Sequence, residues 1–308
     1  MKIAVVGVGA MGSVYAGLLA KAGNEVWAID VSHKHIEAIQ AHGLRVEGAS
    51  GDHTIRLNAT VDAEKAGPCD LVILATKAMQ VEAASQSAKP LIGKNTTVLT
   101  IQNGIGSSEK VAALLGEERV TVGVAGGFGA SIKAPGHVHH NGMELIRLGE
   151  MNGPVSRRVK DITAVWSSAG FNAKAYDDIQ QMIWEKLICN VCYSGVCTVS
   201  ESRIGEVLND EGLWQIAKGC AREAYQVATA KGIKVDIGEP VSYVRAFGEN
   251  MPNAKPSMLL DHMAGRPSEI EAINGAIVRE GANTNVPTIF NEIMTALIIA
   301  KEKSHDMR

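Results

Sequence analysis

The chain has 308 residues, about twice the length of one ordinary domain, so two domains are expected. Lys and Arg (30) nearly balance Asp and Glu (33), which leaves a formal net charge of −3 at neutral pH. This balance argues against nucleic acid as a main partner, because a polyanion needs a strongly basic surface. No window approaches the roughly 18 unbroken apolar residues that a membrane span requires, so no membrane association is expected.

The N-terminus and the cysteines indicate the compartment. Met1-Lys2 and the apolar residues after it resemble the start of a signal peptide, but glycines interrupt the run and the pattern continues as an amphipathic helix. The five cysteines are an odd number in a long chain without secretory features. This usage favours a reducing compartment and free thiols, so we predict a cytoplasmic protein.

Strand and helix patterns alternate over residues 1–175. Lys2–Gly7 is an unbroken apolar run, which is typical of a strand buried on both faces. Alternation at this spacing predicts a parallel sheet with helices on both sides. The expected strands are Lys2–Gly7, Glu25–Asp30, Asp70–Ala75, Thr97–Ile101 and Val120–Ala125, and the expected helices are Ala10–Ala22, Lys34–His42, Val81–Ala88, Ser107–Leu115 and Ser156–Ser168.

The pattern changes toward the middle of the chain. His137–His140 and Glu144–Leu148 predict short antiparallel strands at the sheet edge, and Asn172–Ala175 is suited to close the sheet. After residue 177 strand patterns end and helical periodicity dominates, which predicts an α/β domain followed by an all-helical domain. The expected helices are Ile179–Tyr193, Glu211–Lys231, Ser257–Ala264, Ser268–Glu280 and Thr288–Lys303.

A G-x-G-x-x-G motif, Gly7-Val8-Gly9-Ala10-Met11-Gly12, lies between the first strand and the first helix. Gly7 permits the sharp turn, Gly9 lets a pyrophosphate approach the backbone, and Gly12 allows the helix to pack closely on the strand. The helix that begins at Ala10-Met11 presents free N–H groups and its positive dipole end to the anion. A glycine turn without a ligand is the alternative. The motif predicts a Rossmann-type dinucleotide-binding domain at residues 1–177. The helical pattern after it predicts a second domain at residues 178–308, which we expect to serve substrate binding and dimerisation.

Asp30 ends the second strand, 18 residues after Gly12. A carboxylate at this place accepts hydrogen bonds from the ribose hydroxyls of NAD and repels the 2′-phosphate of NADP, so Asp30 favours NADH. His33, Lys34 and His35 follow, and their basic side chains keep NADPH open as the alternative. A turn residue without a cofactor role is also consistent with Asp30.

The helical half contains polar residues that its apolar pattern does not explain. Lys186 and Asn190 are four residues apart and share one face of a helix. An ammonium group directed at a carbonyl oxygen polarises it and donates a proton after hydride transfer; a solvated lysine is the alternative. Ser268 and Glu271 form a predicted capping box. Glu269 is left without such an explanation, other than as an acid in the first turn of a helix.

Six motifs occur in order along the chain: Gly7-x-Gly9-x-x-Gly12, Lys77, Gln102-Asn103-Gly104, Trp184-x-Lys186-x-x-x-Asn190, Ser257-Met258-x-x-Asp261 and Ser268-Glu269-Ile270-x-x-Ile273-Asn274-Gly275. Together they resemble the ketopantoate reductase (2-dehydropantoate 2-reductase) family. The resemblance covers essentially the whole chain. No single motif decides it, whereas the set is specific.

The resemblance implies a two-domain oxidoreductase with its active site in the interdomain cleft. It implies hydride transfer from NAD(P)H to a branched or aromatic 2-oxo acid, with ketopantoate, NADPH and pantothenate biosynthesis as the family default. Lys186 matches the family's general acid, and Glu269 matches the carboxylate that assists substrate binding and the lysine. The opposite charge of Glu269 favours the ammonium form of Lys186.

The remaining matches concern binding. Asn103, Asn190 and Ser257 match residues that hold the nicotinamide end of the cofactor or the substrate, and Lys77 matches a lysine near the cofactor. Four residues after Asn190 the family often has a second substrate-binding asparagine, whereas this chain has Ser194. The shorter side chain changes which 2-oxo acid fits.

A second departure concerns the cofactor. The family often has an arginine just after the second strand to hold the NADP phosphate, and this chain reads Asp30-Val31. NAD-dependent D-2-hydroxyacid dehydrogenases of the same family are therefore an alternative. A non-catalytic dinucleotide-binding sensor is an alternative of another class, although the intact polar residues of the helical half argue against it. The apolar helical half is also compatible with a homodimer.

Two clusters are expected to bind no metal. Cys189, Cys192 and Cys197 form a C-x-x-C-x-x-x-x-C pattern, but they have apolar neighbours and no fourth ligand, so buried free thiols are expected. His137, His139 and His140 belong to an expected strand, where a solvated sheet edge explains them.

Overall fold

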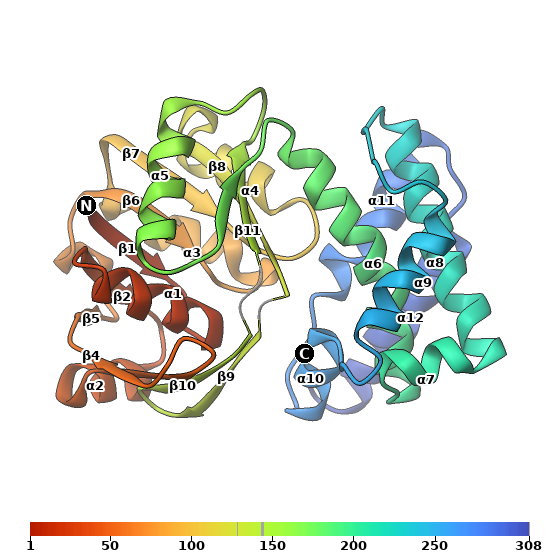
Figure 1. The fold of residues 1–308 in the computed structure, drawn as a ribbon, viewed down its shortest axis with the longest axis horizontal. Helices are drawn as coiled ribbons and strands as arrows, with labels where there is room; N and C mark the ends of the chain where they lie inside the picture. The colour runs from red at the N-terminus through yellow and green to blue at the C-terminus, as the bar shows by residue number, and fades with distance from the viewer. Residues whose placement is uncertain (128, 143–144, 308) are drawn as a thin grey trace. The chain divides into compact units, whose positions relative to one another are not determined.

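The structure is a computed structural model that describes residues 1–127, 129–142 and 145–307 (Figure 1). Contacts within the chain define two compact units. The first comprises Met1–Gln102 and Ser107–Ile179, and the second comprises Asn103–Gly106 and the chain from Gln180 onward. A loop of four residues from the N-terminal half therefore belongs to the helical unit, which a single boundary at residue 177 does not anticipate.

The main sheet of the first unit has eight strands in the order β12-β11-β8-β7-β6-β1-β2-β5. The strands from β8 to β5 are all parallel, and their order is that of a doubly wound dinucleotide-binding fold. This confirms the predicted α/β class. β11 runs antiparallel to β8, and β12 runs parallel to β11. The strands are β1 Lys2–Val6, β2 Glu25–Ile29, β5 Asn58–Thr60, β6 Cys69–Leu74, β7 Ile92–Thr100, β8 Val120–Gly126, β11 Leu145–Glu150 and β12 Ala173–Ala175.

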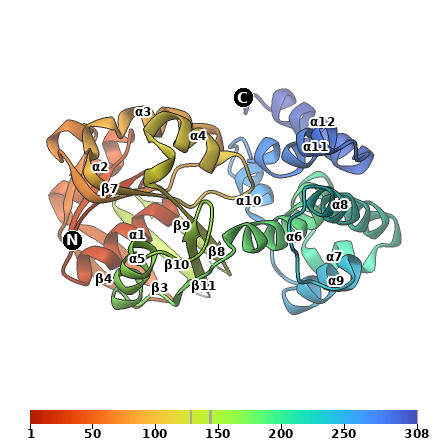
Figure 2. The same ribbon diagram turned by 90° about the horizontal axis from the view of Figure 1, so that it is seen from above.

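Helices cover both faces of this sheet. Ile3 and Val5 of β1 pack in one core with α1 and α5, whereas Ala4 and Val6 pack in the other with α3 and α4. Figure 2 shows these two helix pairs on opposite sides of the strands. The unbroken apolar run of β1 therefore follows from burial on both faces. The helices are α1 Ala10–Lys21, α2 His33–His42, α3 Val81–Ser87, α4 Ser107–Leu115 and α5 Arg157–Ser168, with 3₁₀ turns at Ala63–Lys65, Ala78–Gln80, Lys89–Leu91 and Glu117–Arg119.

A second sheet of four strands, in the order β4-β3-β10-β9, packs on α1. The prediction that His137–His140 extends the main sheet is wrong, because this segment pairs with β3 and β9 instead. The other predicted edge strand is confirmed as β11; Glu144, its expected first residue, lies outside the described residues. The strands of the second sheet are β3 Leu44–Gly48, β4 His53–Ile55, β9 Gly129–Ala134 and β10 His137–Gly142.

Among the described residues of the second unit, the regular secondary structure is helical, as predicted. The expected helix Ser268–Glu280 is wrong in its first part, because Ile270–Ala272 is a 3₁₀ turn and Ile273 (φ −105°, ψ −94°) interrupts the chain before α11. The predicted capping box does not form there, since Ser268 donates to Glu302. The helices are α6 Ile179–Ser200, α7 Ile204–Asn209, α8 Glu211–Ala230, α9 Pro240–Asn250, α10 Ser257–Met263, α11 Asn274–Thr284 and α12 Ile289–Ser304.

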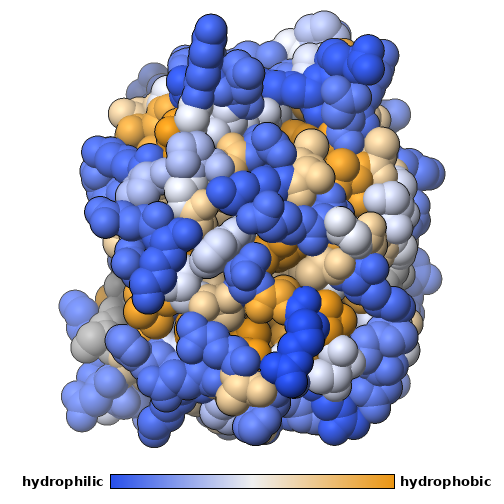
Figure 3. Space-filling model, turned by 90° about the vertical axis from the view of Figure 1, so that its left-hand side faces the viewer, coloured by the Kyte–Doolittle hydropathy of each residue, from blue (hydrophilic) through white to orange (hydrophobic). Residues whose placement is uncertain are grey.

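Among the described residues, no helix has the length and apolar character needed to cross a membrane. The face seen in Figure 3 carries mainly hydrophilic side chains, with smaller hydrophobic areas between them.

Candidate active site

Apart from Asn103, the predicted cofactor residues lie at the carboxyl ends of neighbouring parallel strands in the first unit. Gly7 has φ +90°, and a Cβ atom there would lie 2.5 Å from Cγ2 of Thr76. A Cβ atom at Gly12 would lie 2.0 Å from the carbonyl oxygen of Gly7. At Gly9 a Cβ atom would meet nothing within 4 Å. Contacts within the protein therefore explain why positions 7 and 12 are glycine. Gly9 instead faces open space, as a bound pyrophosphate requires.

The start of α1 fits an anion as well. The N–H groups of Ala10, Met11 and Gly12 belong to the first turn, where backbone donors have no helical acceptor. No acidic residue lies in this turn. Next to Gly7, Oγ1 of Thr76 is buried without a hydrogen-bond partner among the described residues. Free donors, a positive dipole end and an unsatisfied hydroxyl group are suited to the phosphates of a dinucleotide.

Asp30 and Lys77 lie on either side of this turn. Asp30 directly follows β2, whose Ile29 pairs with Val6 of β1 just before the turn. Oδ1 of Asp30 accepts the N–H of Ser32 at 2.9 Å. Lys77 follows β6, the other neighbour of β1, and precedes the turn Ala78–Gln80. The sheet order therefore brings both predicted residues to the edge that carries the glycine turn.

His35 is not available to a cofactor phosphate, so this part of the NADPH alternative is wrong. Its side chain is buried, with Nε2 3.1 Å from Oγ of Ser13 and with Nδ1 accepting the N–H of Gly136 at 3.1 Å. Burial lowers the pKa of His35, which favours the neutral ring. His33 and Lys34 are exposed to solvent.

In the second unit, three polar side chains from distant segments meet. Nζ of Lys186 donates to Oδ1 of Asn103 at 2.8 Å, and Nδ2 of Asn103 donates to Oε2 of Glu269 at 3.1 Å. We call these residues the Lys–Asn–Glu cluster. Lys186 lies in α6 and Asn103 in the loop after β7. Glu269 immediately precedes the turn Ile270–Ala272. Asn103 thereby links Lys186 to Glu269: its amide oxygen accepts from the lysine, and its amide NH₂ group donates to the glutamate.

The loop that carries Asn103 is hydrogen-bonded to the turn that follows Glu269. Ile105 N–H donates to the carbonyl oxygen of Ala272 at 3.1 Å. Gly104 has φ +79°, and a Cβ atom there would lie 2.0 Å from the same oxygen. Only glycine allows so close an approach, which explains the glycine of the Gln102-Asn103-Gly104 motif.

The other predicted substrate residues are less closely joined. Asn190 and Ser194 follow Lys186 at intervals of four along α6 and therefore share its face. Asn190 is partly exposed and Ser194 is buried. Ser257 is the exposed first residue of α10 and makes no side-chain hydrogen bond to the described residues. The hydrogen-bonded cluster therefore contains Asn103 but not these three residues.

Sequence reasoning missed a buried carboxylate in α12. Glu302 is 0% exposed and accepts hydrogen bonds from the N–H (2.8 Å) and the hydroxyl group (2.6 Å) of Ser268. Nε2 of His262 lies 3.1 Å from the same oxygen. The signal that could have found it is the position of Glu302 on the apolar stripe of α12, four and eight residues after Ile298 and Met294. An acid on a buried stripe requires partners.

The thiols and the histidine cluster have structural surroundings. Cys189, Cys192 and Cys197 are buried free thiols, as predicted, and burial raises the pKa of Cys189 and of Cys197 to about 12. His137 and His139 lie beside the carboxylate of Glu47. In the described part of the chain, no group of three or more His, Cys, Asp or Glu side chains is arranged to hold a metal ion.

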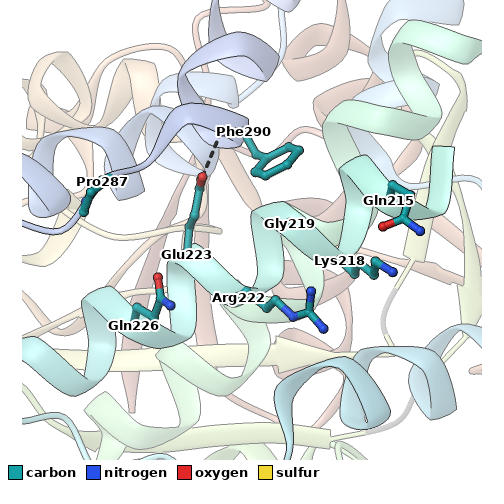
Figure 4. Close-up of a pocket in the computed structure, with 8 residues that line it drawn as sticks. All are labelled: Gln215, Lys218, Gly219, Arg222, Glu223, Gln226, Pro287 and Phe290. Carbon is teal, nitrogen blue, oxygen red and sulfur yellow. Dashed lines mark hydrogen bonds between the residues drawn. The ribbon is translucent and has the colours of Figure 1, made fainter. Parts of the chain in front are cut away.

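A surface groove of about 310 Å³ lies in the second unit, between α8 and the start of α12 (Figure 4). It contains none of the predicted site residues. Glu223, which borders it, accepts the N–H groups of Phe290 (2.9 Å) and Asn291 (3.0 Å). The groove is lined by Gln215, Lys218, Gly219, Arg222, Glu223, Gln226, Pro287 and Phe290. The buried carboxylate of Glu223 thus binds the start of α12.

A doubly wound sheet with a glycine turn, followed by a helical unit with a Lys–Asn–Glu cluster, defines a dinucleotide-dependent oxidoreductase. Residues 3–153 match the family described as ketopantoate reductase PanE/ApbA, and residues 178–302 match its C-terminal counterpart. The chain belongs to the ketopantoate reductase family, which confirms the resemblance found in the sequence.

Named relatives agree with this assignment. The chain is 33% identical over 302 residues to the 2-dehydropantoate 2-reductase of Pyrococcus horikoshii and 30% identical over 311 residues to that of Lactococcus lactis subsp. lactis. Each match covers 98% of both chains. A solved ternary structure of D-mandelate dehydrogenase with NADH and anilino(oxo)acetate is similar over 100% of both chains, with 31% identity and a TM-score of 0.93.

Proposed function

We propose that this chain reduces a 2-oxo acid to the 2-hydroxy acid with a nicotinamide dinucleotide as hydride donor, acting as a 2-dehydropantoate 2-reductase in pantothenate biosynthesis. The observation that carries the proposal is the hydrogen-bonded chain from Lys186 through Asn103 to Glu269. Full-length similarity to relatives named 2-dehydropantoate 2-reductase supports the substrate.

The cluster supplies the proton side of the reaction. When bound, the reduced dinucleotide provides the hydride that adds to the ketone carbon. The ammonium group of Lys186 polarises the ketone oxygen and gives it a proton, so that one hydride and one proton convert C=O to CH–OH. Asn103 directs the ammonium group through its 2.8 Å hydrogen bond. Glu269 places a negative charge beside the same amide and assists substrate binding.

The neighbouring residues suit the rest of a 2-oxo acid. Asn190 and Ser194 add an amide and a hydroxyl group to the face of α6 that carries Lys186, and both groups can bind carboxylate or hydroxyl oxygens. We assign Ser257 to the same task by its position in the family motif. Because Ser194 is smaller than asparagine, it leaves room for a larger substituent on the substrate.

In the first unit, the turn from Gly7 to Gly12 would hold the pyrophosphate, with the N–H groups of Ala10 and Met11 directed to it. Asp30 would bind the ribose hydroxyls, Lys77 would lie near the cofactor, and Asn103 would hold the nicotinamide end as well as the substrate. The carboxylate of Asp30 favours NADH over the NADPH of the family default.

A second candidate is an NAD-dependent D-2-hydroxyacid dehydrogenase of the same family. Asp30 in place of a phosphate-binding arginine favours it. So does the similarity to D-mandelate dehydrogenase, whose solved structure contains NADH. The homodimer and the cytoplasmic location expected from the sequence remain predictions, and neither is required for the reaction.

The test is absorbance at 340 nm with the purified full-length chain, each of NADH and NADPH, and a panel of 2-oxo acids. The panel includes 2-dehydropantoate, branched aliphatic 2-oxo acids and phenylglyoxylate. If NADH or NADPH is oxidised fastest with 2-dehydropantoate, the result supports a 2-dehydropantoate 2-reductase. A preference for NADH with an aromatic 2-oxo acid supports the dehydrogenase. No oxidation with any member of the panel contradicts both, and favours a dinucleotide-binding sensor.

A further inference from the structure

Glu302 is a buried acidic residue that the proposed chemistry does not use. It lies in the last turns of α12 and is 0% exposed. A carboxylate removed from water needs hydrogen-bond donors, because desolvation costs several kcal/mol. Both donors of Ser268, its N–H at 2.8 Å and its hydroxyl group at 2.6 Å, bind the same oxygen of Glu302. One residue therefore supplies two of the hydrogen bonds that satisfy this buried carboxyl group.

Ser268 is the residue immediately before Glu269. Its backbone N–H is bound to Glu302, while the carboxylate of Glu269 accepts from Asn103 at 3.1 Å. Two consecutive residues thus have different partners. Glu302 binds the backbone of Ser268, and Asn103 binds the side chain of Glu269. The contact with Glu302 therefore lies at the residue immediately before Glu269.

Glu302 also reaches the helix that precedes this segment. Nε2 of His262, in α10, lies 3.1 Å from the oxygen that Ser268 binds. The turn between them is closed by Arg266, whose N–H donates to the carbonyl oxygen of Asp261 at 2.9 Å and whose guanidinium donates to the buried carboxylate of Asp261 at 3.0 Å. Glu302 is therefore the common partner of α10 and of the residue before Glu269.

We propose that Glu302 is a positioning residue for the reaction, which holds Ser268 so that Glu269 meets Asn103 and Lys186. The inference rests on the proposed function, because Glu269 matters for turnover only if the Lys–Asn–Glu cluster is the reaction site. A shift of about 1 Å in a catalytic group costs up to about 100-fold in rate. Loss of the Glu302 contact is therefore expected to lower kcat without direct contact to the substrate.

Glu223 offers a matched control in the same unit. It is also a buried carboxylate, and it accepts the N–H groups of Phe290 and Asn291 and the side-chain amide of Asn291. Glu223 binds the first turn of α12, whereas Glu302 belongs to the last turns of the same helix, about 17 Å farther along its axis at 1.5 Å per residue. Its hydrogen bonds hold the start of α12 and not the segment before Glu269.

The experiment compares Glu302→Gln, Glu223→Gln, Ser268→Ala and Ser268→Thr in the full-length chain. The readouts are kcat and KM for the best 2-oxo acid, Kd for the dinucleotide, Tm, and amide hydrogen exchange of residues 268–273. Glu302→Gln and Ser268→Ala are expected to lower kcat about tenfold or more, with unchanged dinucleotide Kd and faster exchange of residues 268–273. Glu223→Gln is expected to lower Tm and to leave kcat within about twofold. Ser268→Thr keeps the hydroxyl group and is expected to retain more activity than Ser268→Ala.

The proposal is overturned if Glu302→Gln lowers Tm as Glu223→Gln does but leaves kcat within about twofold of the wild type. If Glu302→Gln does not fold, Ser268→Ala decides by the same criterion, because it removes only one hydroxyl group. If the wild type reduces no 2-oxo acid, the proposed function fails, and hydrogen exchange decides the positioning separately. Unchanged exchange of residues 268–273 in Glu302→Gln then contradicts it, and faster exchange supports it.

Discussion

The two units form their candidate sites from different materials. In the first unit the site is backbone: a turn whose Gly7 and Gly12 permit close approach, and a helix end with free N–H groups. In the second unit it consists of side chains, Lys186, Asn103 and Glu269, from segments up to 166 residues apart. A backbone site requires particular residues next to one another. A side-chain site requires only that the fold bring its members together.

This difference predicts how each site fails. In the backbone site, an added methyl group does damage whatever its chemistry, because space is the property that matters. In the side-chain site, the chemical group matters and neighbouring lysines or carboxylates are no substitute. Substitutions that change either the volume or the chemical group of a side chain, but not both, therefore test this difference between the two sites.

The largest effect is expected at Lys186. Lys186→Met keeps an unbranched side chain but removes the ammonium group, so kcat should fall about 100-fold or more, since general acid catalysis contributes about 10²–10⁴-fold. Dinucleotide Kd should stay nearly unchanged, because the turn proposed to bind the pyrophosphate lies in the other unit. Stopped-flow and steady-state absorbance at 340 nm measure the first quantity, and fluorescence titration measures the second.

Lys218→Met is the control, because Lys218 lines the groove beside α8 and contributes nothing to the Lys–Asn–Glu cluster. It should leave kcat unchanged. A kcat of Lys186→Met within about fivefold of the wild type would remove Lys186 from the role of general acid.

The second effect separates two glycines of one motif. Gly9→Ala should fold normally, because its Cβ atom meets no protein atom within 4 Å, yet it should weaken dinucleotide binding about tenfold or more by obstructing contacts to the pyrophosphate. Gly12→Ala should lower Tm as well, since its Cβ atom would lie 2.0 Å from the Gly7 carbonyl oxygen. Thermal melts and dinucleotide titrations distinguish the two. Undiminished dinucleotide binding by Gly9→Ala would mean that no phosphate lies at this turn.

A third prediction concerns Asp30, where the first unit does rely on a side chain. Asp30→Ala should weaken NADH binding about tenfold, the value of one or two hydrogen bonds to a charged group, and should raise the ratio of NADPH to NADH activity. His33→Ala, an exposed neighbour, is the control for a nonspecific effect on the loop. A ratio that does not change in Asp30→Ala excludes the carboxylate from cofactor selection.

The comparison also explains which parts of the molecule could be predicted from sequence. The strands β1, β2 and β6 contain apolar runs because both of their faces are buried, and the glycine turn directly follows β1 in the sequence. The second sheet carries no comparable local pattern, because β10 pairs with β3, which lies about 90 residues earlier. Its partner strand, and hence the position of His137, depends on the folded chain.

The same reasoning applies to the helical unit. Lys186 and Asn190 are visible as a pair because helical periodicity places them on one face. The role of Ser268 is not visible in the sequence: its hydroxyl group has the spacing of a capping box with Glu271, but in the fold it donates to Glu302, 34 residues later. The backbone N–H of Ser268 likewise donates to Glu302 and not to Glu271, its acceptor in a capping box, and α11 begins only at Asn274.

The smallest predicted effect is a pH dependence of the first unit through His35, which joins Ser13 of α1 to Gly136. Burial lowers the pKa of His35 in the folded chain, whereas in the unfolded chain a histidine titrates near pH 6.5. Below about pH 6.5 the unfolded chain therefore binds the proton more readily, and the contribution of His35 to stability declines as the pH falls toward the lowered folded pKa. His35→Gln cannot titrate, so the stability advantage of the wild type over it should be larger at pH 7.5 than at pH 5.5. Urea unfolding at both pH values measures this, with His33→Gln as the exposed control, and an advantage that is equal at both would contradict the assignment.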